Sequence, residues 1–355
     1  MRTIRRILAM LPLLFVSAGI LAARTAYADT PAAQTTPPKS TTQAATEPGF
    51  ETVTIPNGDE QPLSAGIWYP TTAPPQEERL GPTTQTVAKS AALKPEGQPL
   101  PLVLISHGSG GWFGGHADTA IALAKAGFIV AAVTHRGDSM DDQSRVADIW
   151  IRPAQLKRLT DYMLTMWPQR SAIDPTKIGV FGFSAGGFTA LVASGGTPDL
   201  TKVTGFCEQH PQQETCEVVR SHHIVIGASS AQSSITWVHD DRIRAAFVAA
   251  PALGFTFPPD GLADVHIPVQ LWRAEFDHVL PSPFYAEAVR DALPSPPIYH
   301  VVANADHYDF LPPCSPTQLA RVPQICGSRP GFDRAAFHAE LNAAVVAFFE
   351  RTLGP

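Results

Sequence analysis

Continuous apolar runs of strand length alternate with helix-like segments from residue 101 to the C-terminus. The runs PLVLISHG, FIVAAVTHRG, KIGVFGFS, IRAAFVAA, IPVQLWRA and IYHVVA are mostly apolar, as in strands that are buried on both faces. Helical character is seen in ADTAIALAKAG, PAQLKRLTDYMLTMWP and AGGFTALVASGG, and again after Asp333. This alternation predicts one α/β domain with a mostly parallel central sheet and helices on both faces.

Two strand-like segments flank Asn57-Gly58 in FETVTIPNGDEQPLSAGIWYP, residues 50–70. Asn-Gly is a strong signal for a two-residue hairpin turn. We therefore expect an N-terminal antiparallel hairpin that joins one edge of the sheet. The Pro-, Thr- and Gln-rich stretch that follows, up to residue 100, is expected to be a loop.

The first 28 residues have the order of a secretory signal peptide. Three arginines precede an apolar stretch over residues 7–23, and AYA at residues 26–28 offers a small-x-small cleavage site. A membrane anchor is the alternative, but the stretch is short and ends in a processable site. Residues 29–48 are rich in Thr, Pro, Ala and Gln, which predicts a disordered leader. The folded domain is then expected over residues 49–355, in an exported protein that is periplasmic or secreted.

The net charge of the chain argues against negatively charged partners. Loss of residues 1–28 removes four arginines and no acidic residue, so the formal charge changes from −6 to −10. A chain that acidic, without a basic run, is a poor match for nucleic acid or for an anionic membrane surface. We therefore expect a small-molecule partner and no stable membrane span after cleavage.

The four cysteines, Cys207, Cys216, Cys314 and Cys326, lie in polar, proline-containing stretches without CxxC spacing. An even number of cysteines in an exported protein predicts disulfides, although four cysteines allow three pairings. The local pairing, Cys207–Cys216 with Cys314–Cys326, is favoured. Free thiols would be expected only in a protein that is not exported.

Ser184 stands at the centre of a G-x-S-x-G pattern, GFSAG at residues 182–186. By itself the pattern is weak, because chance supplies it in roughly one chain of this size in ten. Here an apolar strand precedes it and a helix of small residues follows, which is the context of a nucleophile elbow. Ser184 is therefore the candidate nucleophile, and an ordinary glycine-rich turn is the alternative.

A base and an acid are expected in loops after later strands, in the chain order serine, acid, histidine. His307, in VVANADHYDFL, follows the last predicted strand, and Asp277, in LWRAEFDHVLP, follows the strand before it. His307 would accept the serine proton, and Asp277 would orient and stabilise the imidazole. Three other carboxylates remain open for the role of the acid: Glu275, Asp264 and Asp306.

The glycine-rich loop SHGSGGWFGGH, residues 106–116, follows the first central strand. Its backbone N–H groups can be aimed at an oxyanion, and we expect donors from Ser109 and Ala185. Neither GxxxxGK[ST] nor GxGxxG occurs there, so a nucleotide site is not expected. The histidines show no metal-binding spacing such as HExxH, so we expect no metal site.

Residues 196–242 are too long for a plain connection, and they lie between the elbow helix and the next strand, a usual place for a cap. We expect this segment to be a lid that shapes the acyl or alcohol pocket through Trp237. Trp112 and Phe113 are expected on the opposite side of the pocket. The alternative is that these aromatic residues belong to the ordinary core.

With these residues collected, PLVLISHGSGG, VAAVTHRGD, VFGFSAGGFTAL and ADHYDFL resemble the α/β-hydrolase superfamily. The similarity is to the branch shared by platelet-activating-factor acetylhydrolases and dienelactone-hydrolase-like proteins, and it covers most of residues 50–353. It implies ester hydrolysis without a cofactor, with Ser109 and Ala185 at the matching oxyanion positions. One difference is the nucleophile: dienelactone hydrolases use a cysteine, and Ser184 stands in its place here. In the acetylhydrolases the acid follows the strand after the nucleophile unit, but the corresponding stretch here, FVAAPALGF, has no carboxylate. The resemblance therefore implies an acid one strand later, which is Asp277.

Together these features predict an exported serine hydrolase that cleaves short-chain acyl esters or lipid-like esters. Two alternatives remain. An acyltransferase on the same scaffold would use an alcohol in place of water, and a non-catalytic exported binding protein would have kept only the fold.

Overall fold

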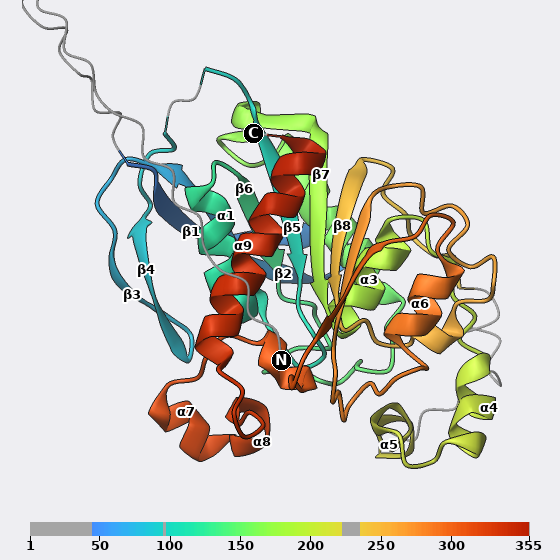
Figure 1. Ribbon diagram of the computed structural model, residues 1–355. Coiled ribbons are helices and arrows are strands. Elements are labelled where there is room, and N and C mark those ends of the chain that lie inside the picture. The colour runs from blue at the N-terminus through green and yellow to red at the C-terminus, as the bar shows by residue number, and fades with distance from the viewer. Residues whose placement is uncertain (1–44, 95–96, 222–234, 355) are drawn as a thin grey trace, which may run out of the picture. The chain divides into compact units, whose positions relative to one another are not determined.

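The computed structural model describes residues 45–94, 97–221 and 235–354 (Figure 1). The expected signal peptide and most of the expected leader lie outside the described residues, as do residues 222–234 of the expected cap. The first strand begins at Glu47, slightly before the expected start of the domain.

The sheet has the strand order β10-β9-β8-β7-β5-β6-β2-β1-β4-β3. Strands β5 to β10 pair in parallel, whereas β2 runs antiparallel to both β6 and β1. The mostly parallel sheet with N-terminal antiparallel strands is thus confirmed. The strands are β1 (Glu47–Asn57), β2 (Glu60–Thr71), β3 (Gln76–Leu80), β4 (Thr83–Lys89), β5 (Leu100–Ser106), β6 (Ile129–Val133), β7 (Ile173–Phe183), β8 (Ile243–Ala249), β9 (Val269–Ala274) and β10 (Ile298–Val302).

Helices pack on both faces of the sheet. Helices α2 and α3 contribute to one hydrophobic cluster, and α1 and α9 contribute to the other. Figure 1 shows α9 lying across the sheet beside α1. The helices are α1 (Ala117–Lys125), α2 (Ile151–Thr165), α3 (Ala185–Ala193), α4 (Lys202–Gln209), α5 (Glu214–Ser221), α6 (Ala286–Ala292), α7 (Pro316–Arg321), α8 (Pro323–Cys326) and α9 (Arg334–Leu353).

Strand β5 illustrates why these residues form a sheet that is covered on both sides. Every residue of β5 is buried. Successive side chains of a strand point to opposite faces. Accordingly, Leu102 and Leu104 belong to one cluster, whereas Val103 and Ile105 belong to the other. Continuous apolar sequence is therefore what a central strand of this sheet requires.

The segment after β2 differs from the expected loop, because it contains the β3–β4 hairpin. Strand β4 pairs in parallel with β1, and β3 pairs antiparallel with β4. The many polar residues of β4 obscure the alternation of buried and exposed positions that is typical of a strand, but Gln85 and Val87 face inward. Val87 is buried, and the buried Gln85 accepts a hydrogen bond of 2.9 Å from the Trp68 indole. The sheet therefore continues beyond the leading hairpin, to the left in Figure 1.

Both disulfides have the local pairing that the sequence favours. Cys207–Cys216 joins α4 to α5, and Cys314–Cys326 joins the segment before α7 to α8. Of the helices in the described ranges, none combines the length and hydropathy that a membrane crossing requires.

Candidate active site

Ser184 occupies a tight turn between the central strand β7 and helix α3. Its φ of 55° and ψ of −120° lie in a region that residues with a side chain rarely adopt. The flanking glycines are needed because the backbones are very close there. A Cβ at Gly186 would overlap the carbonyl of Ser106, and a Cβ at Gly182 would overlap the carbonyl of Gly186. The turn therefore depends on glycine at both positions of the G-x-S-x-G pattern.

The structure brings Ser184, His307 and Asp277 into one hydrogen-bonded chain. Oγ of Ser184 lies 3.1 Å from Nε2 of His307, and Nδ1 of His307 lies 2.8 Å from Oδ2 of Asp277. The side chains of His307 and Asp277 are each only 2% exposed. A carboxylate can only accept, so Nδ1 carries a proton and Nε2 is left to accept one from the serine. This arrangement can activate a serine hydroxyl.

The loops that follow β9 and β10 hold the acid and the base. The other carboxylate oxygen of Asp277 accepts the backbone N–H groups of Val279 and Leu280, at 3.1 and 2.6 Å. Asp306, one of the alternative acids, accepts the backbone N–H groups of His278 and His307 rather than the His307 ring. Asp306 thus ties the two loops together.

Ser109 and Ala185 line the same pocket as Ser184. Ala185 is the first residue of α3, where an N–H group has no partner within the helix. Within the described part of the chain, neither N–H group has a hydrogen-bond acceptor. Both are therefore available to an oxygen that develops negative charge beside Ser184.

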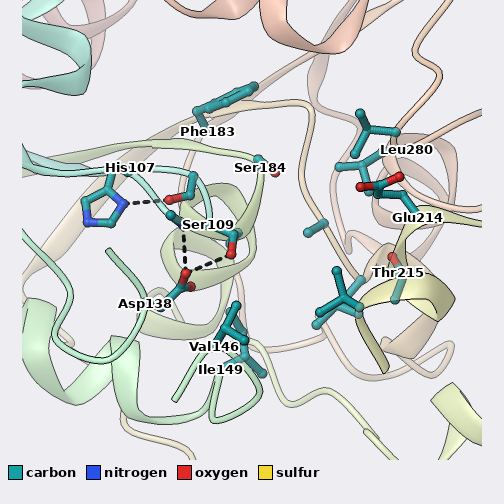
Figure 2. A pocket seen from close by; sticks show the side chains of 18 of the residues that line it. His107, Ser109, Asp138, Val146, Ile149, Phe183, Ser184, Glu214, Thr215 and Leu280 are labelled. Atoms are coloured by element: carbon teal, nitrogen blue, oxygen red, sulfur yellow. Dashed lines mark hydrogen bonds between the residues drawn. The ribbon is translucent and has the colours of Figure 1, made fainter. Parts of the chain in front are cut away.

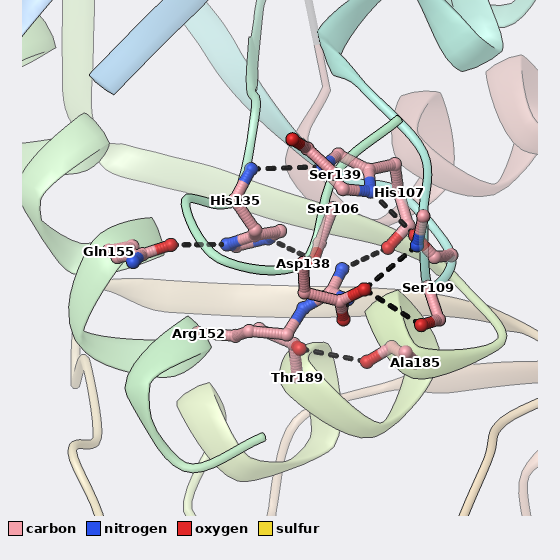
Figure 3. Close-up of polar contacts among 12 residues, drawn as sticks. Ser106, His107, Ser109, His135, Asp138, Ser139, Arg152, Gln155, Ala185 and Thr189 are labelled. Carbon is pink, nitrogen blue, oxygen red and sulfur yellow. Dashed lines mark hydrogen bonds and ion pairs between the residues drawn. The ribbon is translucent and has the colours of Figure 1, made fainter. Parts of the chain in front are cut away.

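A buried ion pair anchors the loop that contains Ser109 (Figure 3). Oδ1 of Asp138 accepts from the Ser109 hydroxyl at 2.7 Å and from the Gly110 N–H at 2.8 Å. Oδ2 of Asp138 lies 2.5 Å from the fully buried Arg152, which also donates to the His107 carbonyl. Burial would raise the pKa of the Asp138 carboxyl, but Arg152 and the Gly110 N–H hold it below its ordinary value.

Two neutral histidines complete this network. Nε2 of His107 accepts the backbone N–H of His135 at 2.9 Å, so its Nδ1 donates to the Gly108 carbonyl at 2.6 Å. Burial, and then the charge of Arg152, lowers the pKa of His107 to about 3 and that of His135 well below its ordinary value. The sequence indicated only scattered histidines. The position of Asp138, just past the end of a strand beside β5, is the signal that could have revealed the network.

A pocket of about 440 Å³ opens above these groups (Figure 2). It contains Ser184, His307, Ser109 and Ala185, and its walls are largely apolar. Helices α4 and α5 of the expected cap contribute to the wall. The apolar wall residues include Val146, Ile149, Trp150, Leu200, Val203, Val218, Val219, Leu253, Val279, Leu280, Leu311 and Ile325.

Trp112, Phe113 and Trp237 do not line this pocket, contrary to expectation. The rings of Trp112 and Phe113 pack on each other, and Phe113 packs near Trp68 of β2. Trp237 packs against Phe188 and donates its indole N–H to the Pro198 carbonyl at 3.1 Å. The three residues pack with the two hydrophobic cores, which is the alternative that the sequence left open.

No three His, Cys, Asp or Glu side chains within the described ranges gather closely enough to hold a metal ion. The polar groups of the pocket wall include Ser184, His307 and the glycine-rich loop that contains Ser109, together with Asp138, Glu214 and Tyr308. The arrangement suits attack on an acyl group by an activated serine.

Two solved structures are similar to this chain. A ferulic acid esterase from Streptomyces cinnamoneus is 21% identical over 88% of this chain and 91% of that chain, with a TM-score of 0.58. A dienelactone hydrolase from Anabaena variabilis is 15% identical over 86% of this chain and 99% of that chain, with a TM-score of 0.49. The comparison with curated proteins gave no match.

Residues 89–253 match a family model, that of the Dienelactone hydrolase family. The matched segment includes the loop that contains Ser109, the ion pair of Asp138 and Arg152, and the turn at Ser184. Over this segment the chain is similar to the Dienelactone hydrolase family.

Proposed function

We propose that this protein is an exported serine hydrolase that cleaves carboxylic esters. One observation carries the proposal: Ser184, His307 and Asp277 form a hydrogen-bonded chain at the floor of a largely apolar pocket. The similarity of residues 89–253 to a hydrolase family supports the same reaction class. The pocket volume of about 440 Å³ suits a small ester or one arm of a lipid-like ester.

In the first half of the proposed reaction, Oγ of Ser184 attacks the ester carbonyl while Nε2 of His307 takes the hydroxyl proton. Asp277 accepts the Nδ1–H bond and stabilises the imidazolium that forms. The N–H groups of Ser109 and Ala185 donate to the oxyanion of the tetrahedral intermediate. Each such donor typically lowers the barrier by about 3 kcal/mol.

Collapse of that intermediate expels the alcohol, which leaves with the proton from His307. An acyl group is then bound to Ser184 through a new ester bond. Water attacks this ester, His307 takes a proton from the water, and the same two N–H groups stabilise the second oxyanion. Release of the acid returns the proton to Ser184, so the cycle needs no other reactant.

Replacement of the nucleophile tests this proposal. We expect Ser184→Ala to lower kcat for p-nitrophenyl butyrate by at least about a thousand-fold, because no other group can form the acyl-enzyme. Ser194→Ala is the matched control, since Ser194 lies just after the same helix and does not line the pocket. A fluorophosphonate probe should label the wild type and the Ser194 variant only. A folded Ser184 variant with wild-type turnover would refute the proposal.

We further propose that residues 1–28 are a signal peptide, that residues 29–48 are a disordered leader, and that residues 196–242 form a cap. The two disulfides support an oxidising compartment, either periplasmic or extracellular. N-terminal sequencing of the exported protein should begin at Asp29. An exported protein that retains residues 1–28 would contradict this part of the proposal.

A further inference from the structure

The charges that face the pocket are strongly asymmetric. Within the described ranges, the pocket wall contains two carboxylates, those of Asp138 and Glu214, and no lysine or arginine. Asp138 is neutralised by its ion pair with Arg152 at 2.5 Å. Glu214 has no hydrogen bond or ion pair to any described residue. Its carboxylate is therefore a net negative charge beside an otherwise apolar wall.

The backbone of Glu214 is fixed by its neighbours along the chain, and its side chain is exposed. It is the first residue of α5, and the next residue, Thr215, lies 3.1 Å from the hydroxyl of the buried Tyr285. One residue further, the fully buried Cys216 is bonded to Cys207 of α4. Figure 2 shows Glu214 and Thr215 on the side of the pocket opposite Ile149.

The charge of Glu214 affects the pKa of a tyrosine that lines the pocket. Tyr308 lines the pocket next to His307, and burial raises the pKa of its hydroxyl. The negative charge of Glu214 raises that pKa further. Asp277, behind His307, adds a second negative charge. A substrate group that enters between Tyr308 and α5 therefore meets negative potential, and the described residues of the pocket wall include no lysine or arginine to offset it.

We propose that Glu214 selects substrates by charge, so that the pocket takes esters whose group beside α5 is cationic or uncharged and rejects esters that carry a carboxylate there. The inference rests on the proposed ester hydrolysis. A quaternary ammonium group fits this region best. Its methyl groups suit the apolar walls formed by Val218 and Leu280, and its charge suits both Glu214 and the ring face of Tyr308.

Esters of equal shape and different charge test the inference. Butyrylcholine and 3,3-dimethylbutyl butyrate differ only by nitrogen in place of carbon, and 2-sulfoethyl butyrate carries an anionic group on the same side. A second set puts a trimethylammonium, tert-butyl or carboxylate group at the end of the acyl chain of p-nitrophenyl esters. Ratios of kcat/KM within each set cancel any general effect of a variant on the chemical step.

In at least one set, we expect the wild type to prefer the cationic ester to the anionic ester. Attraction and repulsion across several ångströms of partly solvated pocket are each worth a factor of roughly three, so the ratio should fall about ten-fold in Glu214→Gln. Glu214→Lys should reverse it. Glu217→Gln is the matched control. Glu217 lies on the same helix, makes an exposed ion pair with Arg220 at 2.6 Å and does not line the pocket, so the ratio should not change.

The outcomes separate this inference from the proposed function. A wild type that cleaves the neutral esters without charge preference in either set overturns the selection by Glu214 and leaves the esterase proposal standing. A charge preference that survives in Glu214→Gln also overturns it. A wild type that cleaves none of the esters overturns both proposals.

Discussion

At the scale of single residues, a buried ion pair anchors the loop that contains Ser109, a proposed oxyanion donor. Asp138 uses one carboxylate oxygen for Arg152 and the other for Ser109 and Gly110. Removal of one partner from a buried pair leaves an uncompensated charge, which is costly. Asp138 and Arg152 are therefore positioning residues for the proposed reaction, and their loss should harm folding as well as turnover.

A milder substitution separates positioning from folding. Ser109→Ala removes the hydroxyl that donates to Asp138 at 2.7 Å and keeps the backbone N–H that we propose as an oxyanion donor. A hydrogen bond to a charged group is worth about 1.5 to 3 kcal/mol, so we expect kcat to fall at least about ten-fold with a smaller change in KM. Ser144→Ala removes a comparable bond to Asp142, 2.6 Å long, in an exposed loop, and should leave kcat unchanged. Equal kinetics in the two variants would show that the hydroxyl does not position the loop.

His116 should make folding stability depend on pH. It is 1% exposed, and neither ring nitrogen has a partner among the described residues. Burial lowers its pKa from 6.5 to about 4, although the charge of Asp118 acts in the opposite direction. Between these values the unfolded chain binds a proton that the folded chain does not. Stability should therefore fall by about 3 kcal/mol as the pH drops from 6.5 to 4.

Urea unfolding of His116→Phe at pH 7.5 and pH 5 measures this effect. Phenylalanine does not titrate and can pack between Phe181 and Phe183, so the variant should lose less stability than the wild type on acidification. Part of the slope should remain, because buried His107 has the same sign of pKa shift. Parallel losses in the two proteins would rule out His116 as a source.

At the scale of elements, the sequence predicted the buried strands and the tight turn at Ser184, because burial and backbone geometry restrict the residues at those positions. The apolar runs from β5 to β10 predicted central parallel strands, and the small residues around Ser184 predicted the elbow. The β3–β4 hairpin was missed because only one side of it is buried and its polar composition is typical of a loop. The environments of Trp112 and Trp237 depend on tertiary packing, and an aromatic residue suits core and pocket equally. The spacing of aromatic residues along the chain does not distinguish a core position from a pocket position.

The two disulfides should have different effects, because they brace different elements. Loss of Cys314–Cys326, a link across 12 residues, should lower stability by about 3 kcal/mol and lower kcat/KM, since Ile325 and Leu311 belong to the pocket wall. Loss of Cys207–Cys216 should release α5, raise KM and weaken the charge preference that we assign to Glu214. Paired Cys→Ser variants, with melting temperature and kinetics, measure this. A fully reduced protein with unchanged melting and activity would contradict both expectations.

At the scale of the whole molecule, one sheet connects the first described strand to the site. Strand β1 pairs with β2 and β4, β2 pairs with β6, and β6 pairs with β5, which leads into the oxyanion loop. Glu51 of β1 also accepts the Trp167 indole N–H at 2.7 Å. The N-terminal strand is thus part of the sheet that supports the proposed active site, whereas none of these pairings involves a residue before Glu47.

Two truncations test where the folded unit begins. A protein that starts at residue 45 keeps all of β1, so its melting temperature and kcat/KM should equal those of a protein that starts at residue 29. A protein that starts at residue 60 loses β1 with its buried Phe50 and Ile55, and β4 loses a neighbour. Removal of one such side chain alone costs about 2 to 5 kcal/mol, comparable with the whole stability of many domains, so this protein should not fold. Circular dichroism and esterase activity distinguish the results, and a shorter protein that melts cooperatively at the same temperature would place the start of the folded unit after β1.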